Sequence, residues 1–148
     1  MEKKYWTLIV FGFLVNSLEA PKVLLLKRKG EVRWTLPYGE PERKDKSFPL
    51  VLGRVIDKQI CSNRHFHDWR ESKLVDVYPS FFFGDLYILY FLKVKEKAFP
   101  KQTKEMIVRF ASQDELNKEI LLPNQGQPGN QYGRMWQMCQ DGFSYIKI

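Results

Sequence analysis

Three charged residues in the first half of the chain have the spacing of neighbours on a helix. Arg54, Asp57 and Lys58 stand at positions i, i+3 and i+4, so a helix would place them on one face. One carboxylate flanked by two cations within ~6 Å should hold a divalent metal ion poorly, because like charge near the metal opposes it. Arg54 and Lys58 could instead neutralise a phosphate group directly. The simpler alternative is a solvated helix face without a ligand.

A helix that begins at Phe48 would carry these three residues. Ser47 is a favourable N-cap, and Pro49 is tolerated only in the first helical turn. Apolar residues then recur at helical spacing and predict one buried stripe: Phe48, Val51, Leu52, Val55, Ile56 and Ile60. A short turn that ends at Gly39 and a charged loop precede this helix.

The remaining segments predict a sheet and two more helices. Strands are expected at residues 5–16, 23–29, 33–36, 73–78, 86–94 and 104–110, and the first two could form a hairpin. Ser112 and Glu115 have the spacing of a capping box at a helix start, and a final helix is expected at about 131–140. This order predicts an α+β fold in one domain, residues 1–148, with a mixed β-sheet flanked by helices in an α/β/α sandwich.

Composition and charge limit the function classes. The chain has 148 residues, 44% of them hydrophobic, and a net charge of +7, which favours an anionic partner or simply a basic soluble protein. Cys61 and Cys139 are too few for a disulfide framework, so we expect both to be reduced core thiols of a cytoplasmic protein. His65 and His67 lack the pattern of a zinc site. The apolar segment near the N-terminus is too short to span a membrane, so we expect a buried first strand there.

The segment from Trp34 to Cys61 resembles the signature of the Nudix superfamily. That signature is a glycine, five residues, a glutamate, seven residues, then Arg-Glu, an apolar residue, any residue, Glu-Glu, any residue, a glycine and an apolar residue. Counted from Gly39, its positions are taken by Asp45, Gly53, Arg54, Val55, Asp57, Lys58, Ile60 and Cys61. The preceding Trp34-Thr35-Leu36-Pro37-Tyr38-Gly39 is similar to the family's Trp-x-Leu-Pro-Gly-Gly, with Tyr38 in place of one glycine.

The resemblance implies a Nudix-like fold and a site for Mg²⁺ bound to a diphosphate, held by carboxylates on one helix face. Here that face carries Arg54, Asp57 and Lys58, a formal +1 where the family has −3. Asp57 and Asp45 are the candidate catalytic residues, and Asp57 is the candidate metal ligand, with further oxygen donors at Glu40, Glu42 or Glu105. The candidate ligand-binding residues are Arg54, Lys58, Tyr38, Gly39, Arg28 and Glu40.

We therefore expect a Nudix-fold protein that binds a nucleoside-diphosphate-linked ligand, with weak or no pyrophosphohydrolase activity. Mg²⁺ is expected as a cofactor only if the protein is catalytically active. One alternative is an active, divergent Mg²⁺-dependent hydrolase, and another is an RNA- or protein-binding scaffold in a ribonucleoprotein assembly. The Phe81-Phe82-Phe83 run beside a turn raises the further option of a protein interface or homodimer. A membrane partner is not expected.

Overall fold

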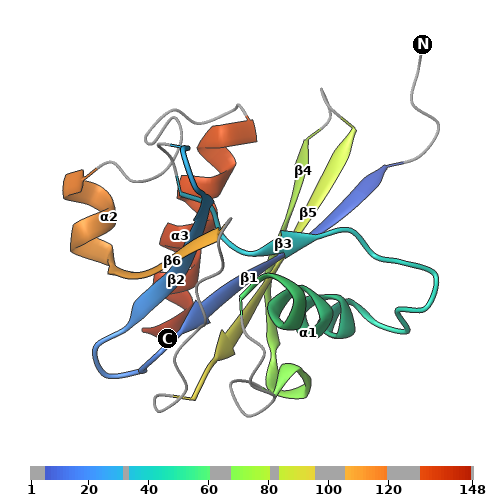
Figure 1. The fold of residues 1–148 in the computed structure, drawn as a ribbon, viewed down its shortest axis with the longest axis horizontal. Helices are drawn as coiled ribbons and strands as arrows, with labels where there is room; N and C mark the ends of the chain where they lie inside the picture. The colour runs from blue at the N-terminus through green and yellow to red at the C-terminus, as the bar shows by residue number, and fades with distance from the viewer. Residues whose placement is uncertain are drawn as a thin grey trace.

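A computed structural model of the chain describes residues 6–31, 34–60, 68–80, 84–95, 106–119 and 131–147. The strands are β1 (Thr7–Val15), β2 (Lys22–Arg28), β3 (Tyr38–Gly39), β4 (Lys73–Ser80), β5 (Asp85–Lys93) and β6 (Met106–Ser112). The helices are α1 (Phe48–Gln59), α2 (Gln113–Glu119) and α3 (Gln131–Ile146), with a short 3-10 helix η1 (Trp69–Glu71) before β4. Figure 1 shows these elements.

The strands form one mixed sheet in the order β4-β5-β1-β2-β6. β1 runs parallel to β5 over its whole length, whereas β2 with β1, β6 with β2, and β4 with β5 are antiparallel. The predicted strands are thus confirmed to within a few residues, except for the segment 33–36. β1 therefore lies at the centre of the sheet, beside β5, which is distant from it in sequence.

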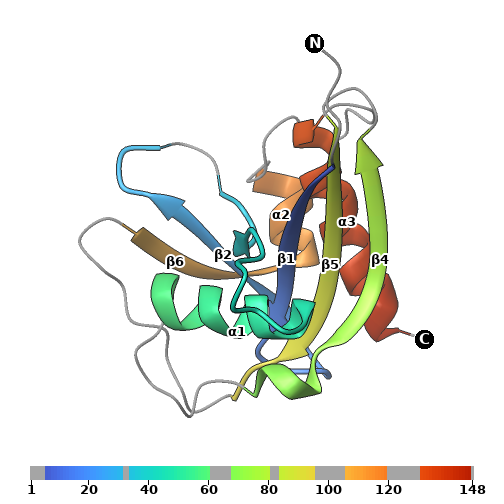
Figure 2. The ribbon, with the colours of Figure 1, turned by 90° about the vertical axis from the view of Figure 1, so that its right-hand side faces the viewer.

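Helices cover both faces of this sheet, with α1 on one side and α2 and α3 on the other (Figures 1 and 2). Because side chains alternate along a strand, β1 contributes to two cores. Val10 and Leu14 pack with the apolar stripe of α1, and Phe11 and Phe13 pack with α3. Gly12 lies on the α1 side, where a Cβ would collide with Leu52. The α/β/α sandwich is confirmed.

β1 and β2 start as a hairpin and then diverge, and the chain after Trp34 fills the gap between them. Val15 pairs with Val23 at the closed end. Further along, Thr35 bridges to Leu26 of β2, and β3 pairs with β1 at Val10 and Phe11. The strand predicted at 33–36 is therefore wrong in position. The regular pairing falls at β3, where Tyr38 and Gly39 lie beside Phe11 and Val10 of β1.

The predicted helix starts are correct because local hydrogen bonds decide them. The Leu50 N–H donates to the Ser47 hydroxyl at 3.4 Å, which makes Ser47 the N-cap of α1. At α2 the Glu115 N–H donates to Ser112 Oγ, and the Ser112 N–H donates to Glu115 Oε1. This reciprocal pair is the capping box that the spacing predicts.

Helix α3 continues to Ile146, six residues beyond the predicted end at Gln140. A glycine such as Gly142 ordinarily weakens a helix interior. In the structure Gly142 lies flat against the Phe13 ring, and a Cβ there would be 2.5 Å from ring carbons. The close approach requires a glycine, and it lets Phe143 pack edge-on against Phe13 in the core.

Some predictions lie outside the described residues, namely those on Cys61, His65, His67, Phe81 to Phe83 and Glu105. Cys139 is described and is a buried free thiol, as predicted, and burial raises its pKa. In the described ranges no helix has the length and apolar character needed to cross a membrane.

Candidate functional site

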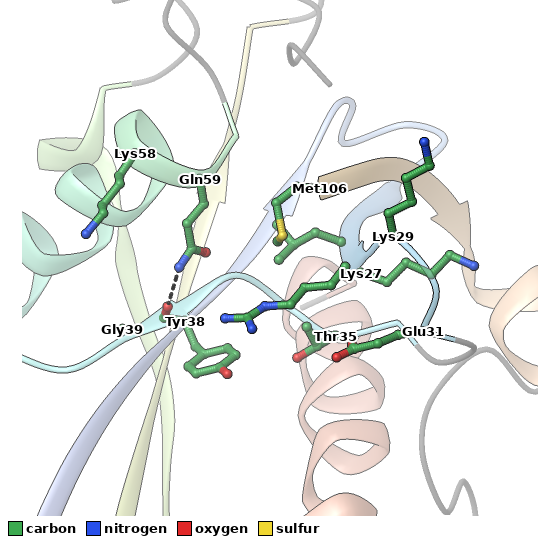
Figure 3. Close-up of a pocket in the computed structure, with 11 residues that line it drawn as sticks. Lys27, Lys29, Glu31, Thr35, Tyr38, Gly39, Lys58, Gln59 and Met106 are labelled. Carbon is green, nitrogen blue, oxygen red and sulfur yellow. Dashed lines mark hydrogen bonds between the residues drawn. The ribbon is translucent and has the colours of Figure 1, made fainter. Parts of the chain in front are cut away.

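An open cleft of about 1350 Å³ lies where β2 and the segment 35–39 separate from the C-terminal end of α1 (Figure 3). In Figure 3, Lys58 and Gln59 border it from the end of α1, and Lys27 and Lys29 border it from β2 and the following turn. The described residues of its lining are Leu26, Lys27, Arg28, Lys29, Glu31, Thr35, Tyr38, Gly39, Lys58, Gln59 and Met106.

The described lining is strongly cationic. It contains four cations and one carboxylate, a formal excess of three positive charges: Lys27, Arg28, Lys29 and Lys58 against Glu31. Three of these cations are consecutive. Along β2 the buried run ends at Leu26, Lys27 is half-buried and Arg28 is exposed. The Lys27 ammonium also lies 4.9 Å from the centre of the buried Trp34 ring, a cation–π contact that holds this lysine at the rim.

Tyr38 presents an aromatic wall to the cleft. The residue is 46% exposed, and its ring centre lies 5.4 Å from that of Phe11, with the two ring planes tilted by 32°. The adjacent Gly39 packs so closely on α1 that a Cβ would collide with Val55. Gln59 of α1 donates from Nε2 to the Tyr38 carbonyl oxygen at 3.4 Å. Tyr38 and Gly39 are therefore both held against α1.

Arg54 lies on the same helix, but its guanidinium binds the loop that precedes α1. Nη2 donates to Asp45 Oδ2 at 2.9 Å and to the Glu40 carbonyl oxygen at 2.8 Å, and Nε lies 3.4 Å from Asp45 Oδ1. Nη1 is 3.2 Å from Glu42 Oε1. The Arg54 and Asp45 side chains are only 22% and 3% exposed, so this ion pair is largely shielded from solvent.

The guanidinium changes the acidity of its partner. The hydrogen bonds from Arg54, aided by the Glu42 backbone N–H, hold the pKa of Asp45 below its ordinary value despite the opposing effect of burial. The same pair raises the pKa of Arg54. A lowered folded-state pKa means that the charged form stabilises the fold above the unfolded-state pKa, about 4.

We predict that Asp45→Asn lowers the melting temperature near neutral pH but has little effect in acid. The native contribution is complete above about pH 4 and is lost as the pH falls through the lowered folded-state pKa. Thermal unfolding followed by circular dichroism from about pH 3 to about pH 7 checks this. A difference between the two proteins that stays constant down to the acid end would contradict the predicted linkage.

The cleft contains four of the predicted site residues, Arg28, Tyr38, Gly39 and Lys58. The other four are placed elsewhere among the described residues: Arg54, Asp45 and Glu40 form the loop contact, and Asp57 is an exposed residue of α1. The sequence reasoning missed Lys27, Lys29 and Gln59. The run of three cations immediately before Gly30 was a signal that could have identified the two lysines.

The residues present do not fit the Mg²⁺ site that the resemblance implies. Both Asp45 carboxylate oxygens face Arg54, and Asp57 is followed by Lys58 on α1. Over the described ranges, His, Cys, Asp and Glu side chains form no group of three or more that could hold a metal ion. A divalent ion needs several oxygen ligands free of competing cations, so the donor set on this helix face is unsuitable.

Two other departures from the resemblance have structural roles. Gly53 replaces an arginine of the signature and leaves space for Trp69 of η1, whose ring atoms would lie 2.5 Å from a Cβ at that position. Ile60 replaces the signature glycine and is buried in the core beneath α1. Both positions are therefore well packed in this structure.

No protein-family model matches the sequence, and no curated protein matches it. Solved structures do match over nearly the whole chain. The NUDIX domain of Shewanella oneidensis NrtR complexed with ADP ribose has 13% identity and a TM-score of 0.68, with 97% of this chain and 90% of that chain covered. A C. elegans Ap4A hydrolase binary complex has 10% identity and a TM-score of 0.64, with 95% and 98% covered. A structure from an analysis of MutT from Aliivibrio salmonicida and Vibrio cholerae has 14% identity and a TM-score of 0.60, with 90% and 96% covered.

These similarities, together with the mixed sheet between helices, show that the chain has a Nudix-like fold. At such low identities the similarity concerns the fold.

Proposed function

We propose that this Nudix-like protein binds a nucleoside-diphosphate-linked ligand in the cationic cleft and hydrolyses it weakly or not at all. The observation that carries the proposal is the lining itself, which includes four cations and an exposed aromatic ring. A diphosphate supplies the complementary negative charge, and an aromatic wall suits the flat face of a nucleobase.

The protein's own cations would replace the metal ion in charge neutralisation. Arg28 offers a planar fork of donors to phosphate oxygens, and Lys58 offers a compact charge from the opposite side of the cleft. The similar NrtR domain is complexed with ADP ribose, which supports a ligand of this class. Weak activity is expected because the helix face lacks a carboxylate cluster that could position Mg²⁺ against a diphosphate.

Isothermal titration with ADP-ribose, ATP and a capped dinucleotide in EDTA tests the proposal. We expect heat for at least one of them, with an affinity that falls as salt rises and is unchanged when Mg²⁺ replaces EDTA. No heat for any of the three would end the proposal. Magnesium-dependent release of phosphate or mononucleotide, abolished by Asp57→Ala, would instead identify an active divergent hydrolase and assign Asp57 a catalytic role.

The net charge of +7 also suits RNA, so a short single-stranded RNA belongs in the same titrations. Nucleic-acid affinity falls steeply with salt because bound counterions are released. RNA binding that is tighter than nucleotide binding, with a steep salt slope, would favour the scaffold role.

A further inference from the structure

The helix face that should hold a metal ion in a Nudix-like fold holds a guanidinium contact here. Oxygen atoms from three residues of one loop converge on Arg54: the Glu40 carbonyl oxygen, Glu42 Oε1 and both carboxylate oxygens of Asp45. A set of oxygens gathered from a loop around one cation is also the way proteins ligate a divalent ion. The cation in this protein is a side chain.

We infer that Arg54 replaces a divalent cation as the crosslink between the loop 40–45 and α1, and so positions the Tyr38 wall of the cleft without metal. The guanidinium suits the task because it is permanently charged and presents five donors in a fixed planar fork. The loop also closes on itself, since the Glu42 N–H donates to Asp45 Oδ2 at 2.7 Å and the Asp45 N–H donates to the Glu42 carbonyl at 2.9 Å.

Three consecutive residues, 38–40, connect the Arg54 contact to the cleft. Arg54 fixes the Glu40 carbonyl, Gln59 fixes the Tyr38 carbonyl, and Gly39 between them packs against Val55. All three contacts come from α1, so the helix holds the segment 38–40 at adjacent points. Releasing the Arg54 contact would free one end of this segment and loosen Tyr38, although Arg54 itself is outside the cleft lining.

The first test is thermal unfolding of the native protein, Arg54→Ala, Arg54→Lys and Lys44→Ala in EDTA and in millimolar Mg²⁺ or Mn²⁺. We expect one melting temperature for the native protein in all three conditions. Arg54→Ala should melt lower by about 3–10 °C in EDTA, because the shielded Asp45 carboxylate loses its partner. Divalent ions should recover part of this loss, since they can bind the abandoned oxygens.

Lys44→Ala is the matched control, because Lys44 makes an exposed ion pair with Glu42 at 3.5 Å in the same loop. It should change the melting temperature little and show no response to divalent ions. Arg54→Lys keeps the charge but loses the fork, so it should melt between the native protein and Arg54→Ala. It also keeps the test decisive if Arg54→Ala fails to fold.

Two outcomes would overturn the inference. One is a native melting temperature that rises by several degrees with Mg²⁺ or Mn²⁺, which would reveal a native metal site. The other is that Arg54→Ala loses stability without any response to divalent ions, or that Arg54→Lys has the melting temperature of the native protein. Either result would reduce Arg54 to an ordinary ion pair. These measurements contain no nucleotide, so they succeed or fail independently of the proposed function.

A second readout rests on the proposed function and concerns the cleft. Titration with ADP-ribose in EDTA, at a temperature where both proteins are folded, should show about tenfold weaker binding for Arg54→Ala and unchanged binding for Lys44→Ala. Mn²⁺ should restore part of the lost affinity. If the native protein binds none of the tested ligands, the proposed function fails while the melting data still decide the role of Arg54. Equal affinities for the native protein and Arg54→Ala would overturn the positioning role.

Discussion

Replacing Arg28 and Lys58 together by glutamate is expected to lower the affinity for ADP-ribose in EDTA by at least about 100-fold. A hydrogen bond to a charged group contributes about 1.5–3 kcal/mol, and two such contacts correspond to about 3–6 kcal/mol, or two to four orders of magnitude. The two residues border the cleft from β2 and from α1, so the double variant removes cations from both sides. Isothermal titration at fixed ionic strength measures the change.

The control for this variant must change the net charge equally without touching the cleft. Lys93→Glu with Lys95→Glu meets that need, because both lysines are exposed. Lys93 pairs with Val15 at the closed end of the β1–β2 hairpin, away from the open end at Arg28. We expect its affinity to stay within about threefold of the native value, since distant exposed charges are screened by salt. Equal losses in both variants would mean that overall charge attracts the ligand and that the cleft is not its site.

Phe143→Ala is expected to lower the free energy of unfolding by about 3–5 kcal/mol. Phe143 is 2% exposed, and its ring meets that of Phe13 edge-on at 5.0 Å. Truncation removes this aromatic contact and leaves a cavity between α3 and β1, where the close approach of Gly142 limits any collapse. A loss of this size is a large part of the ordinary stability of a domain. Urea unfolding at neutral pH measures it.

Ser144→Ala is the matched control, since Ser144 is the next residue of α3 and is exposed. Its effect should be within about 0.5 kcal/mol. If Phe143→Ala lost less than about 1 kcal/mol, α3 would not be packed against β1 as described, because full burial of a phenylalanine alone is worth more.

The sequence predicted those parts of the fold that local interactions decide. The start of α1 depends on Ser47 and Pro49, and that of α2 depends on Ser112 and Glu115, all close in sequence to the backbone groups they satisfy or restrict. The apolar periodicity gave the long strands to within a few residues, because burial on a face imposes that periodicity. These signals need no knowledge of the rest of the chain.

Contacts between distant segments decided the rest of the fold. A glycine in the position of Gly142 disfavours a helix interior, but its packing against Phe13 explains why α3 continues through it. The segment of β3 looks like a turn in the sequence. It becomes a strand because β1 and β2 diverge, which leaves an edge of β1 free to pair with it. In both cases the local preference points one way, and packing or pairing with another strand outweighs it.

The candidate site divides in the same way. The sequence by itself determined that Arg54 and Lys58 flank Asp57 at helical spacing and that three cations precede Gly30, because residue types and charges are fixed by the chain itself. Only the tertiary structure decided which groups each charged side chain contacts. The loop after Gly39 folds back onto α1, which commits Arg54 to Glu40 and Asp45 and leaves Lys58 at the cleft. Helical spacing places Arg54 and Lys58 on one face, but it contains no information about which of them a loop will reach.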